Sequence, residues 1–139
     1  MAADADVIRR LTNEVFLGGD LSNWDELIDD DFVDHDPMPG MADDKKGQRD
    51  VAEMVISTFS DRKMSLHELA ETGDGRIVEN WRMEGKHVGE AMGIPPSNQE
   101  ISVRGMELWR VADGKIVEHW GVVDISDVLE KAGLVPPPS

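Results

Sequence analysis

The chain has 139 residues, no cysteine and a formal net charge of −15 at pH 7, from 29 acidic and 14 basic side chains. This length is typical of one domain with a core of its own, so we expect a single domain over residues 1–139, ordered from about 4 to 134 and ending in a tail at 135–139. The lack of cysteine excludes disulfides, thiolate metal sites and cysteine nucleophiles. The acidic balance disfavours nucleic acid and anionic membranes as partners, because both require clustered lysine and arginine.

The chain shows no sign of membrane insertion or export. No apolar run approaches the ~20 residues that span a bilayer. The N-terminal stretch MAADADVIRR has acidic residues where a secretory signal would place positive charge. We therefore expect a soluble cytoplasmic protein. Its excess of acid either keeps molecules apart by repulsion, the interpretation we prefer, or reflects a high-salt environment.

The first part of the chain is predicted to be helical. Apolar residues at helical spacing predict a helix over residues 4–17, which Gly18 ends. A second, short helix is expected over residues 21–29 and a third over residues 47–59. Between these two, Phe32-Val33 indicates a brief extended segment that leads into a proline-containing loop.

The second part of the chain is predicted to form strands. We expect strands over residues 64–72 and 76–85 and a hairpin over residues 101–124. Residues 87–92 fit either a loop or a short strand, and residues 125–132 a closing helix. Helices followed by a run of antiparallel strands indicate an α+β domain. A sheet of this size can curl around the N-terminal helices and enclose a pocket.

The hairpin is the strongest local prediction. Asp113-Gly114 suits a two-residue turn, because both positions of such a turn need positive φ. This turn predicts the pairs Ala112–Lys115, Trp109–Glu118, Glu107–Trp120 and Val103–Asp124. In this register one face mixes tryptophans with carboxylates, as the lining of a cavity would; its members are Val103, Gly105, Glu107, Trp109, Glu118, Trp120, Val122 and Asp124. His119 falls on the opposite face, which favours a structural or interface role.

Four segments resemble the SnoaL-like polyketide cyclase family, also called SnoaL-like ester cyclases. They are WDEL at 24–27, FVDHDP at 32–37, GKHVGE at 85–90 followed by GIPP at 93–96, and DGKIVEHW at 113–120. They occur in the family's order, and the similarity runs from about Asp4 to Leu134. Four ordered motifs are more specific than any one of them alone.

The resemblance implies a fold and an activity. The fold is the nuclear transport factor 2-like cone, a curved, largely antiparallel sheet around helices with an internal apolar pocket. Homodimers are frequent in the family, and neither a metal nor an organic cofactor is expected. Characterised members close a ring by intramolecular aldol condensation of a polyketide methyl ester, with an aspartate of the last strand as acid–base group. Asp124 takes that role here, although relatives often have an acid where this chain has Gly121.

Asp124 is therefore the first candidate catalytic residue. In the predicted pairing it lies with Trp120 and Glu107. Loss of solvation among indole rings would raise its pKa toward that of a working general base. Alternatively, Asp124 caps the closing helix that follows it directly. Both interpretations are open at this stage.

Two histidines complete the candidate catalytic set. His35, between two aspartates, fits an oxyanion donor or a turn with local hydrogen bonds. His87, beside two glycines on an expected pocket rim, fits a donor to a substrate carbonyl or a plain surface residue. The four histidines are too dispersed in sequence to predict a metal site. The candidate substrate-binding residues are Trp81, Trp120, Met106, Glu79, Glu107 and Arg104.

Three functions follow from these residues. The first is a cofactor-independent cyclase or isomerase that acts on a small hydrophobic carbonyl compound. The second is an epoxide hydrolase-like enzyme, which needs Asp124, Glu79 and Arg104 to surround a water molecule. The third is a non-catalytic module that binds a small apolar ligand or serves as a dimeric scaffold. The lack of tyrosine, the usual phenolic oxyanion donor, favours this third function over steroid-type isomerase chemistry.

Overall fold

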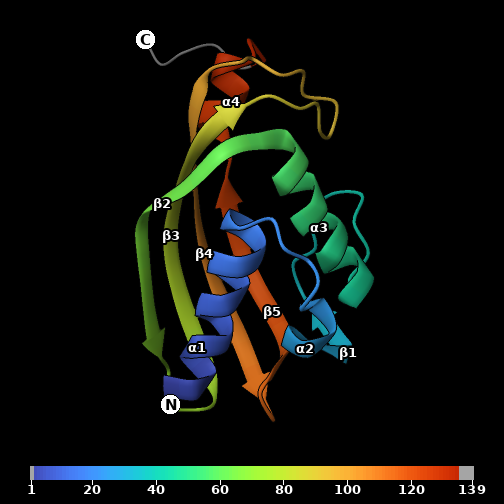
Figure 1. The fold of residues 1–139 in the computed structure, drawn as a ribbon, viewed down its shortest axis with the longest axis vertical. Helices are drawn as coiled ribbons and strands as arrows, with labels where there is room; N and C mark the ends of the chain where they lie inside the picture. Colours follow the sequence, from blue (N-terminus) through green and yellow to red (C-terminus); the bar gives the residue numbers. More distant parts are fainter. Residues whose placement is uncertain (1, 135–139) are drawn as a thin grey trace.

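A strongly curved sheet organises the fold, as a computed structural model that describes residues 2–134 shows (Figure 1). The sheet has five strands in the order β1-β5-β4-β3-β2. Their bounds are β1 (Ile28–Asp34), β2 (Phe59–Glu71), β3 (Arg76–His87), β4 (Glu100–Ala112) and β5 (Lys115–Asp124). Neighbouring strands are antiparallel except β1 and β5, which are parallel. The expected α+β class with a curved, antiparallel-rich sheet is confirmed.

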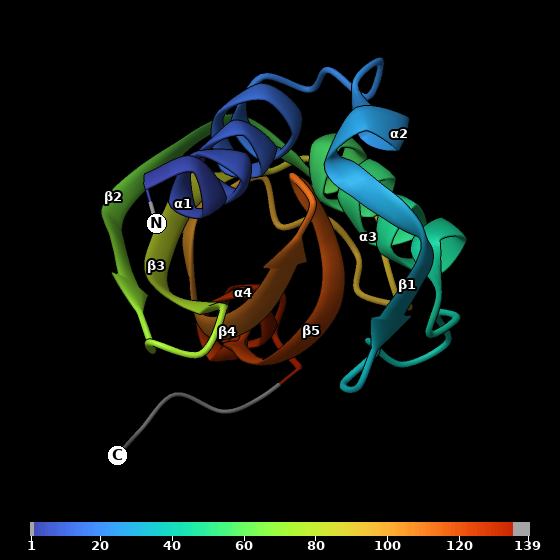
Figure 2. The same ribbon diagram turned by 90° about the horizontal axis from the view of Figure 1, so that it is seen from below.

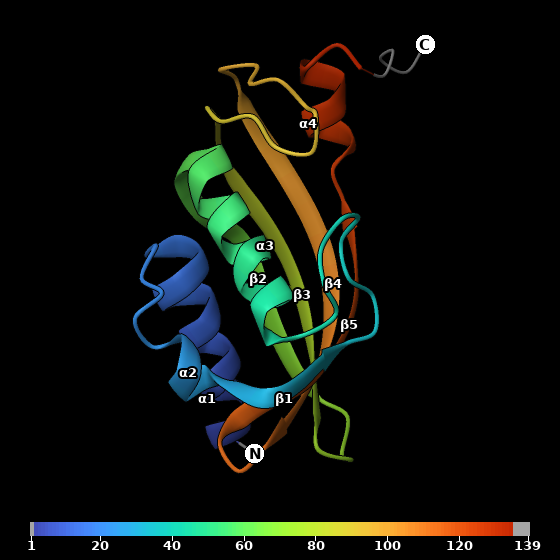
Figure 3. The same ribbon diagram turned by 90° about the vertical axis from the view of Figure 1, so that its right-hand side faces the viewer.

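The helices close the concave side of the sheet. Seen from below, the strands form a trough whose open side is covered by α1 (Ala2–Arg10) and α3 (Lys45–Thr58) (Figure 2). Helix α1 continues as a π-helical segment, η1 (Leu11–Leu17), so the helix expected over residues 4–17 is present. Figure 3 shows the short helix α4 (Ser126–Lys131) at the opposite end of the molecule from the N-terminus.

One helix is shorter than the sequence predicts. The helix expected over residues 21–29 is only α2 (Trp24–Leu27), because β1 begins at Ile28. Ile28 is fully buried and pairs with Ile116 of β5. A long-range strand pairing therefore overrides the local helical preference. The tail predicted at residues 135–139 lies outside the described residues.

The turn of the hairpin is as predicted, but its register is not. Asp113 and Gly114 have φ of 51° and 77°, and Ala112 pairs with Lys115. Beyond this pair, Val117 is an extra residue in β5, because Val111 pairs with Ile116 and Arg110 with Glu118. The predicted partners are therefore wrong by one residue: Trp109 pairs with His119, Glu107 with Gly121 and Arg104 with Asp124. Such a bulge moves every later side chain of β5 to the other face.

Two apolar clusters hold the layers together. The larger one joins α1, η1, α2 and β1 to the turn end of the β4–β5 hairpin and includes the buried Trp24 and Trp109. The smaller one joins α4 to β3 and the start of β4 through Val128, Met83 and Val103. Among the described residues, no helix is both long and apolar enough to cross a membrane.

Helix α3, which covers the sheet, is capped at its N-terminus by the side chain of Asp44. The Asp44 side chain accepts a hydrogen bond of 2.9 Å from the Gly47 backbone N–H. We expect Asp44→Ala to lower the free energy of unfolding by about 1 kcal/mol, because an orphan helix donor loses its partner. Urea denaturation measures the change. Asp44→Asn should keep most of the stability, and Asp43→Ala, which changes the exposed neighbouring residue, should have little effect. Equal losses from the Asp43 and Asp44 variants would contradict this capping role.

Candidate active site

An internal cavity of about 450 Å³ lies between the concave face of the sheet and the helices. Apolar side chains dominate its wall, and they come from η1, α3, β2, the loops after β1 and β3, and the segment that contains α4. They include Leu11, Phe16, Pro37, Met38, Val51, Met54, Val55, Phe59, Met64, Ile94, Ile125 and Val128. This size and composition are typical of a small-molecule site.

The strands add a small set of polar groups to this apolar wall. Alternate residues of each strand face inward, so β3 contributes Glu79 and His87, β4 contributes Glu107, and β5 contributes His119. Asp34, the last residue of β1, also lines the cavity. All five residues are buried. Buried ionisable groups within an apolar cavity are a sign of a functional site.

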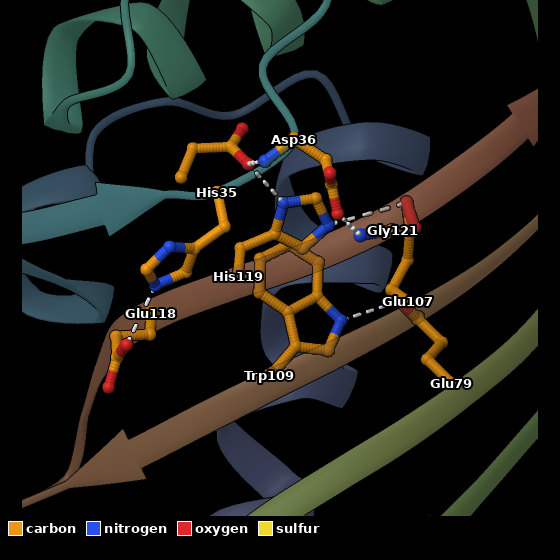
Figure 4. Close-up of polar contacts among 9 residues, drawn as sticks. His35, Asp36, Glu79, Glu107, Trp109, Glu118, His119 and Gly121 are labelled. Carbon is orange, nitrogen blue, oxygen red and sulfur yellow. Dashed lines mark hydrogen bonds and ion pairs between the residues drawn. The ribbon is translucent and has the colours of Figure 1, made fainter.

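His119 lies between two carboxylates at the centre of this site (Figure 4). Its Nδ1 donates a hydrogen bond of 2.8 Å to Asp34 Oδ1. Its Nε2 lies 3.5 Å from Glu107 Oε1, within ion-pair range but without a hydrogen bond. The parallel pairing of β1 and β5 brings Asp34 beside His119, and the bulge in β5 turns the imidazole inward. The result is a buried Asp34–His119–Glu107 row.

The three groups of this row differ in proton affinity. Burial lowers the pKa of His119, but the hydrogen bond to Asp34 and the Glu107 carboxylate outweigh that effect and raise it to about 9. Burial raises the pKa of Glu107 to about 7, although His119 opposes the rise. Burial is the largest single effect on Asp34 and raises its pKa, but the hydrogen bond and charge of His119, with the Asp36 backbone N–H, together hold that pKa below its ordinary value. Near neutral pH, His119 is thus a cation, Asp34 an anion, and Glu107 able to take or give a proton.

A third buried carboxylate, Glu79, has hydrogen-bond partners at both oxygens. Its Oε1 accepts a bond of 3.0 Å from Trp109 Nε1, and its Oε2 accepts one of 2.9 Å from Thr12 Oγ1. His67 Nε2 lies 2.7 Å from the same Oε2. Glu79 pairs across the strands with Glu107, so the two carboxylates are neighbours. Because Glu79 has three partners, it is fixed in place, whereas Glu107 Oε2 has none.

Gly121 leaves room for the Glu107 carboxylate. The two residues pair across β4 and β5, and a Cβ at position 121 would collide with Glu107 Oε2 and approach His119 Nε2. The Gly121 backbone N–H is held by Asp36 Oδ2 at 2.9 Å (Figure 4). The space that an acid at position 121 would occupy is therefore filled by the Glu107 carboxylate, which reaches it from the neighbouring strand.

The predicted position of Asp124 is wrong. Its side chain is exposed and outside the cavity, because the bulge in β5 turns it to the outer face. Asp124 Oδ1 accepts a hydrogen bond of 2.9 Å from the Ser126 backbone N–H, and this bond lowers its pKa rather than raising it. The capping interpretation is wrong as well, because the N-cap residue of α4 is Ile125 and that helix has no side-chain cap hydrogen bond. Asp124 instead closes a turn just before the helix.

Four further sequence-predicted residues also lie outside the cavity. Arg104 is bound on the outer face to Asn80 Oδ1 and to the carbonyl oxygens of Trp81 and Gly105. His35 pairs with Glu118 at 2.8 Å and stacks on Trp120, with ring centroids 4.6 Å apart. Met106 is 44% exposed. The predicted pocket positions of these residues, His35, Trp120, Met106 and Arg104, are therefore wrong.

The remaining predicted residues do line the cavity, namely Glu79, Glu107, Trp81 and His87. His87 is buried within the wall rather than placed on a rim. The sequence reasoning missed Asp34 and assigned His119 to the wrong face. The DHD segment at 34–36 and the EHW motif were the available signals, but neither indicates that the two segments are adjacent strands.

Comparisons with known proteins agree with this architecture. The family model described as SnoaL-like polyketide cyclase matches residues 6–131. A nogalonic acid methyl ester cyclase from Streptomyces nogalater is 28% identical over 120 residues, which are 85% of this chain and 89% of that protein. The structure of wild-type IdmH from Streptomyces antibioticus, a candidate polyketide cyclase, is 29% identical with a TM-score of 0.77, covering 94% of this chain and 98% of that one. TsrD from Streptomyces laurentii shares the fold, with 22% identity, a TM-score of 0.82 and coverage of 96% and 97%.

Together, the curved sheet, the covering helices and the cavity with its buried ionisable groups define a nuclear transport factor 2-like fold. The chain belongs to the SnoaL-like polyketide cyclase family.

The Asp34–His119 contact predicts an unusual titration. NMR of the His119 ring should show a midpoint near 9, well above the ordinary value of about 6.5. Asp34→Asn should lower that midpoint, because the imidazolium loses its anionic partner. Asp31→Asn, at an exposed position of the same strand, should leave it unchanged, and the signal that His119→Gln removes identifies the residue.

The same shift predicts how stability depends on pH. The pKa of His119 is higher in the folded than in the unfolded protein. Its contribution to the free energy of unfolding should therefore be complete below about pH 6.5 and lost as the pH rises through about 9. The gap in unfolding free energy between the wild type and His119→Gln should shrink over this range in urea denaturation. A midpoint at or below the ordinary value, or a gap that does not shrink, would contradict the assignment.

Proposed function

We propose that this protein is a cofactor-independent cyclase that closes a ring in a hydrophobic polyketide ester by an intramolecular aldol reaction. The observation that best supports this proposal is the environment of the Glu107 carboxylate. It lies in an apolar cavity beside a histidine cation and has a pKa of about 7. A base that removes a proton α to a carbonyl works best when its pKa is close to the operating pH. Glu107 takes the role that the sequence suggested for Asp124.

The reaction needs a base and a donor. Glu107 removes a proton from the carbon between two carbonyl groups, and the electron pair of that C–H bond forms an enolate. The enolate carbon attacks a second carbonyl of the same molecule, so that one C–C bond forms and the carbonyl becomes an alkoxide. Glu107 then returns its proton to the alkoxide oxygen. Protons and electrons balance without any further reactant.

His119 supplies the stabilising charge. Its Nε2 points toward Glu107 and has no hydrogen-bond partner. As an imidazolium it can donate to the enolate oxygen, and a fixed donor in a dry site stabilises developing negative charge. Asp34 keeps the imidazole protonated and oriented through Nδ1. Asp34 is therefore a positioning residue, whereas Glu107 and His119 touch the reacting groups.

The similarity to known proteins supports the substrate class. The Streptomyces nogalater relative is named for the methyl ester of nogalonic acid, and the cavity wall here is mainly apolar. The hydrolase interpretation is less well supported, because no arginine is among the described residues that line the cavity. Arg104, the arginine suggested for that chemistry, lies on the outer face.

We further propose a cytoplasmic homodimer that binds neither nucleic acid nor membranes. The net charge of −15 supports the lack of both anionic partners. The outer face of the sheet supports self-association, because Met106 and Val122 pair across β4 and β5 there and are 44% and 72% exposed. Large apolar side chains that adjoin on an open sheet face are typical of an interface.

Glu107 and Asp124 give a direct test of the catalytic proposal. With nogalonic acid methyl ester and related aromatic polyketide esters as substrates, Glu107→Gln should lower kcat by about 10²- to 10⁴-fold, because the base is lost. Asp124→Asn should retain wild-type turnover. The wild-type rate should rise as the pH increases through about 7, where Glu107 ionises. Loss of activity in Asp124→Asn with retention in Glu107→Gln would reverse the assignment. Hydrolysis of terpene epoxides without any ester cyclisation would favour the hydrolase.

Sedimentation analysis tests the dimer. We expect a species of twice the chain mass of 15.4 kDa. Val122→Lys should shift it toward the monomer, because a charge would be buried at the interface. Val88→Lys, at an apolar residue that is 41% exposed in the loop after β3, is the matched control and should leave the mass unchanged. A wild-type monomer at high concentration would end this part of the proposal.

A further inference from the structure

Four buried side-chain polar atoms of the described residues have no hydrogen-bond partner, and all four residues line the cavity. Glu107 Oε2 and His119 Nε2 belong to the reaction site described above. The other two atoms are Thr58 Oγ1 and His87 Nδ1. The proposed mechanism uses neither of these two atoms. Buried polar atoms are rarely left unpaired, so these two need an explanation of their own.

Thr58 and His87 are brought together by the junction between α3 and β2. Thr58 is the last residue of α3, and Phe59, which follows it, pairs with His87. The Thr58 carbonyl oxygen accepts hydrogen bonds from the backbone N–H groups of Val88 and Gly89, at 2.9 and 3.0 Å. The backbones at Thr58 and His87 are therefore adjacent, and both residues line the cavity. Both are well over nine-tenths buried, with 4% and 1% of their surface exposed.

This pair lies well away from the reacting groups. Glu79, opposite Glu107, and His87 are eight residues apart on β3, from 79 to 87. At about 3.3 Å per residue, this is at most ~26 Å of strand, and the curvature of the sheet shortens it. Trp81 and Met83 lie between them on the same inward face and also line the cavity. Along β3, the Thr58–His87 pair and the reacting groups are thus separated by apolar side chains.

We infer that Thr58 and His87 form a second polar subsite, which binds a phenolic hydroxyl at the end of the substrate remote from the reacting carbon. A threonine hydroxyl donates and accepts, and a neutral imidazole has one donor and one acceptor nitrogen. Such a pair satisfies both the donor and the acceptor of a phenol, whereas a carbonyl offers only an acceptor. The inference rests on the proposed cyclase function and narrows its substrate to one with a hydroxyl at the end remote from the reacting carbon.

The subsite assigns His87 to substrate binding rather than to acid–base chemistry. Its ring tilts against Phe59, with centroids 5.5 Å apart, which fixes its plane. Thr58 is fixed by the end of α3. Two immobilised groups recognise a hydroxyl at little cost in side-chain entropy. They would select among polyketides that have the same reacting end but different ring oxygenation.

The test uses two matched probes that are not substrates. One is a methyl ester of an anthracene carboxylic acid with a hydroxyl on the opposite terminal ring; the other has a methyl group in place of that hydroxyl. Quenching of tryptophan fluorescence reports binding, because Trp81 and Trp109 line the cavity. The wild type should bind the hydroxyl probe about five- to tenfold more tightly, the ratio expected for one buried hydrogen bond.

Isosteric variants then locate the effect. Thr58→Val should abolish the preference for the hydroxyl probe, while Thr58→Ser should restore it. His87→Leu should also weaken it, and Met83→Leu, which changes an apolar residue of the same wall, should keep it. Circular dichroism and thermal melting identify any variant that does not fold. A wild type without preference, a Thr58→Val variant that keeps it, or failure of both probes to bind would overturn the inference.

The outcome is independent of the catalytic proposal. Glu107→Gln should show the same probe preference as the wild type, because the reacting end is not involved in recognising the hydroxyl. If esters are not cyclised but the preference depends on Thr58, the proposed reaction fails and the subsite stands. If Glu107-dependent cyclisation occurs without a hydroxyl preference, the subsite fails and the reaction stands.

Discussion

The single extra residue in β5 decides which chemistry the cavity contains. Strand side chains alternate between faces, so inserting Val117 opposite an otherwise regular β4 exchanges the two faces for the rest of the strand. His119 and Gly121 thereby face inward, while Trp120 and Asp124 face outward. Without the bulge, the cavity would receive an indole ring and an aspartate from β5. With it, the cavity receives an imidazole and a space for the Glu107 carboxylate from β4.

Burying several ionisable groups in an apolar cavity is costly, and the fold compensates each of them differently. Asp34 has the cationic His119 beside it, and Glu79 has three hydrogen-bonding partners. Glu107 has an ion-pair neighbour at 3.5 Å and one oxygen without any partner. Incomplete compensation raises the pKa of Glu107 to about 7. The same burial that destabilises this carboxylate is what makes it suitable as a base.

Two groups of polar residues in the cavity wall are separated by apolar side chains. The Asp34–His119–Glu107 row lies where β1, β5 and β4 meet, and the Thr58–His87 pair lies where α3 passes into β2. Trp81 and Met83 are between the two on β3. A flat apolar ligand with oxygens at both ends fits this distribution better than a compact one. The shape of the site and the reaction proposed for it thus point to the same class of molecule.

The sequence by itself determined the local and periodic features: the helix that begins the chain, the Asp113-Gly114 turn and the order of helices before strands. The resemblance of four short motifs correctly indicated the family. These features depend on interactions between residues that are close together in the chain, so a short stretch of sequence is enough to predict them. Glu79, Trp81 and Glu107 line the cavity because alternation along β3 and β4 is regular. His87 also lines it, but the sequence left residues 87–92 open between a loop and a short strand.

Only the tertiary structure decided the composition of the site. The pairing of β1 with β5, which places Asp34 beside His119, joins segments 85 residues apart, and no local pattern specifies it. The bulge at Val117 depends on how the curved sheet closes rather than on the turn residues that set the start of the register. Asp124, the most plausible acid in the sequence, was therefore misplaced by one residue of register. Which side chains of β5 face the cavity depends on such long-range constraints, whereas the presence of a strand at β5 does not.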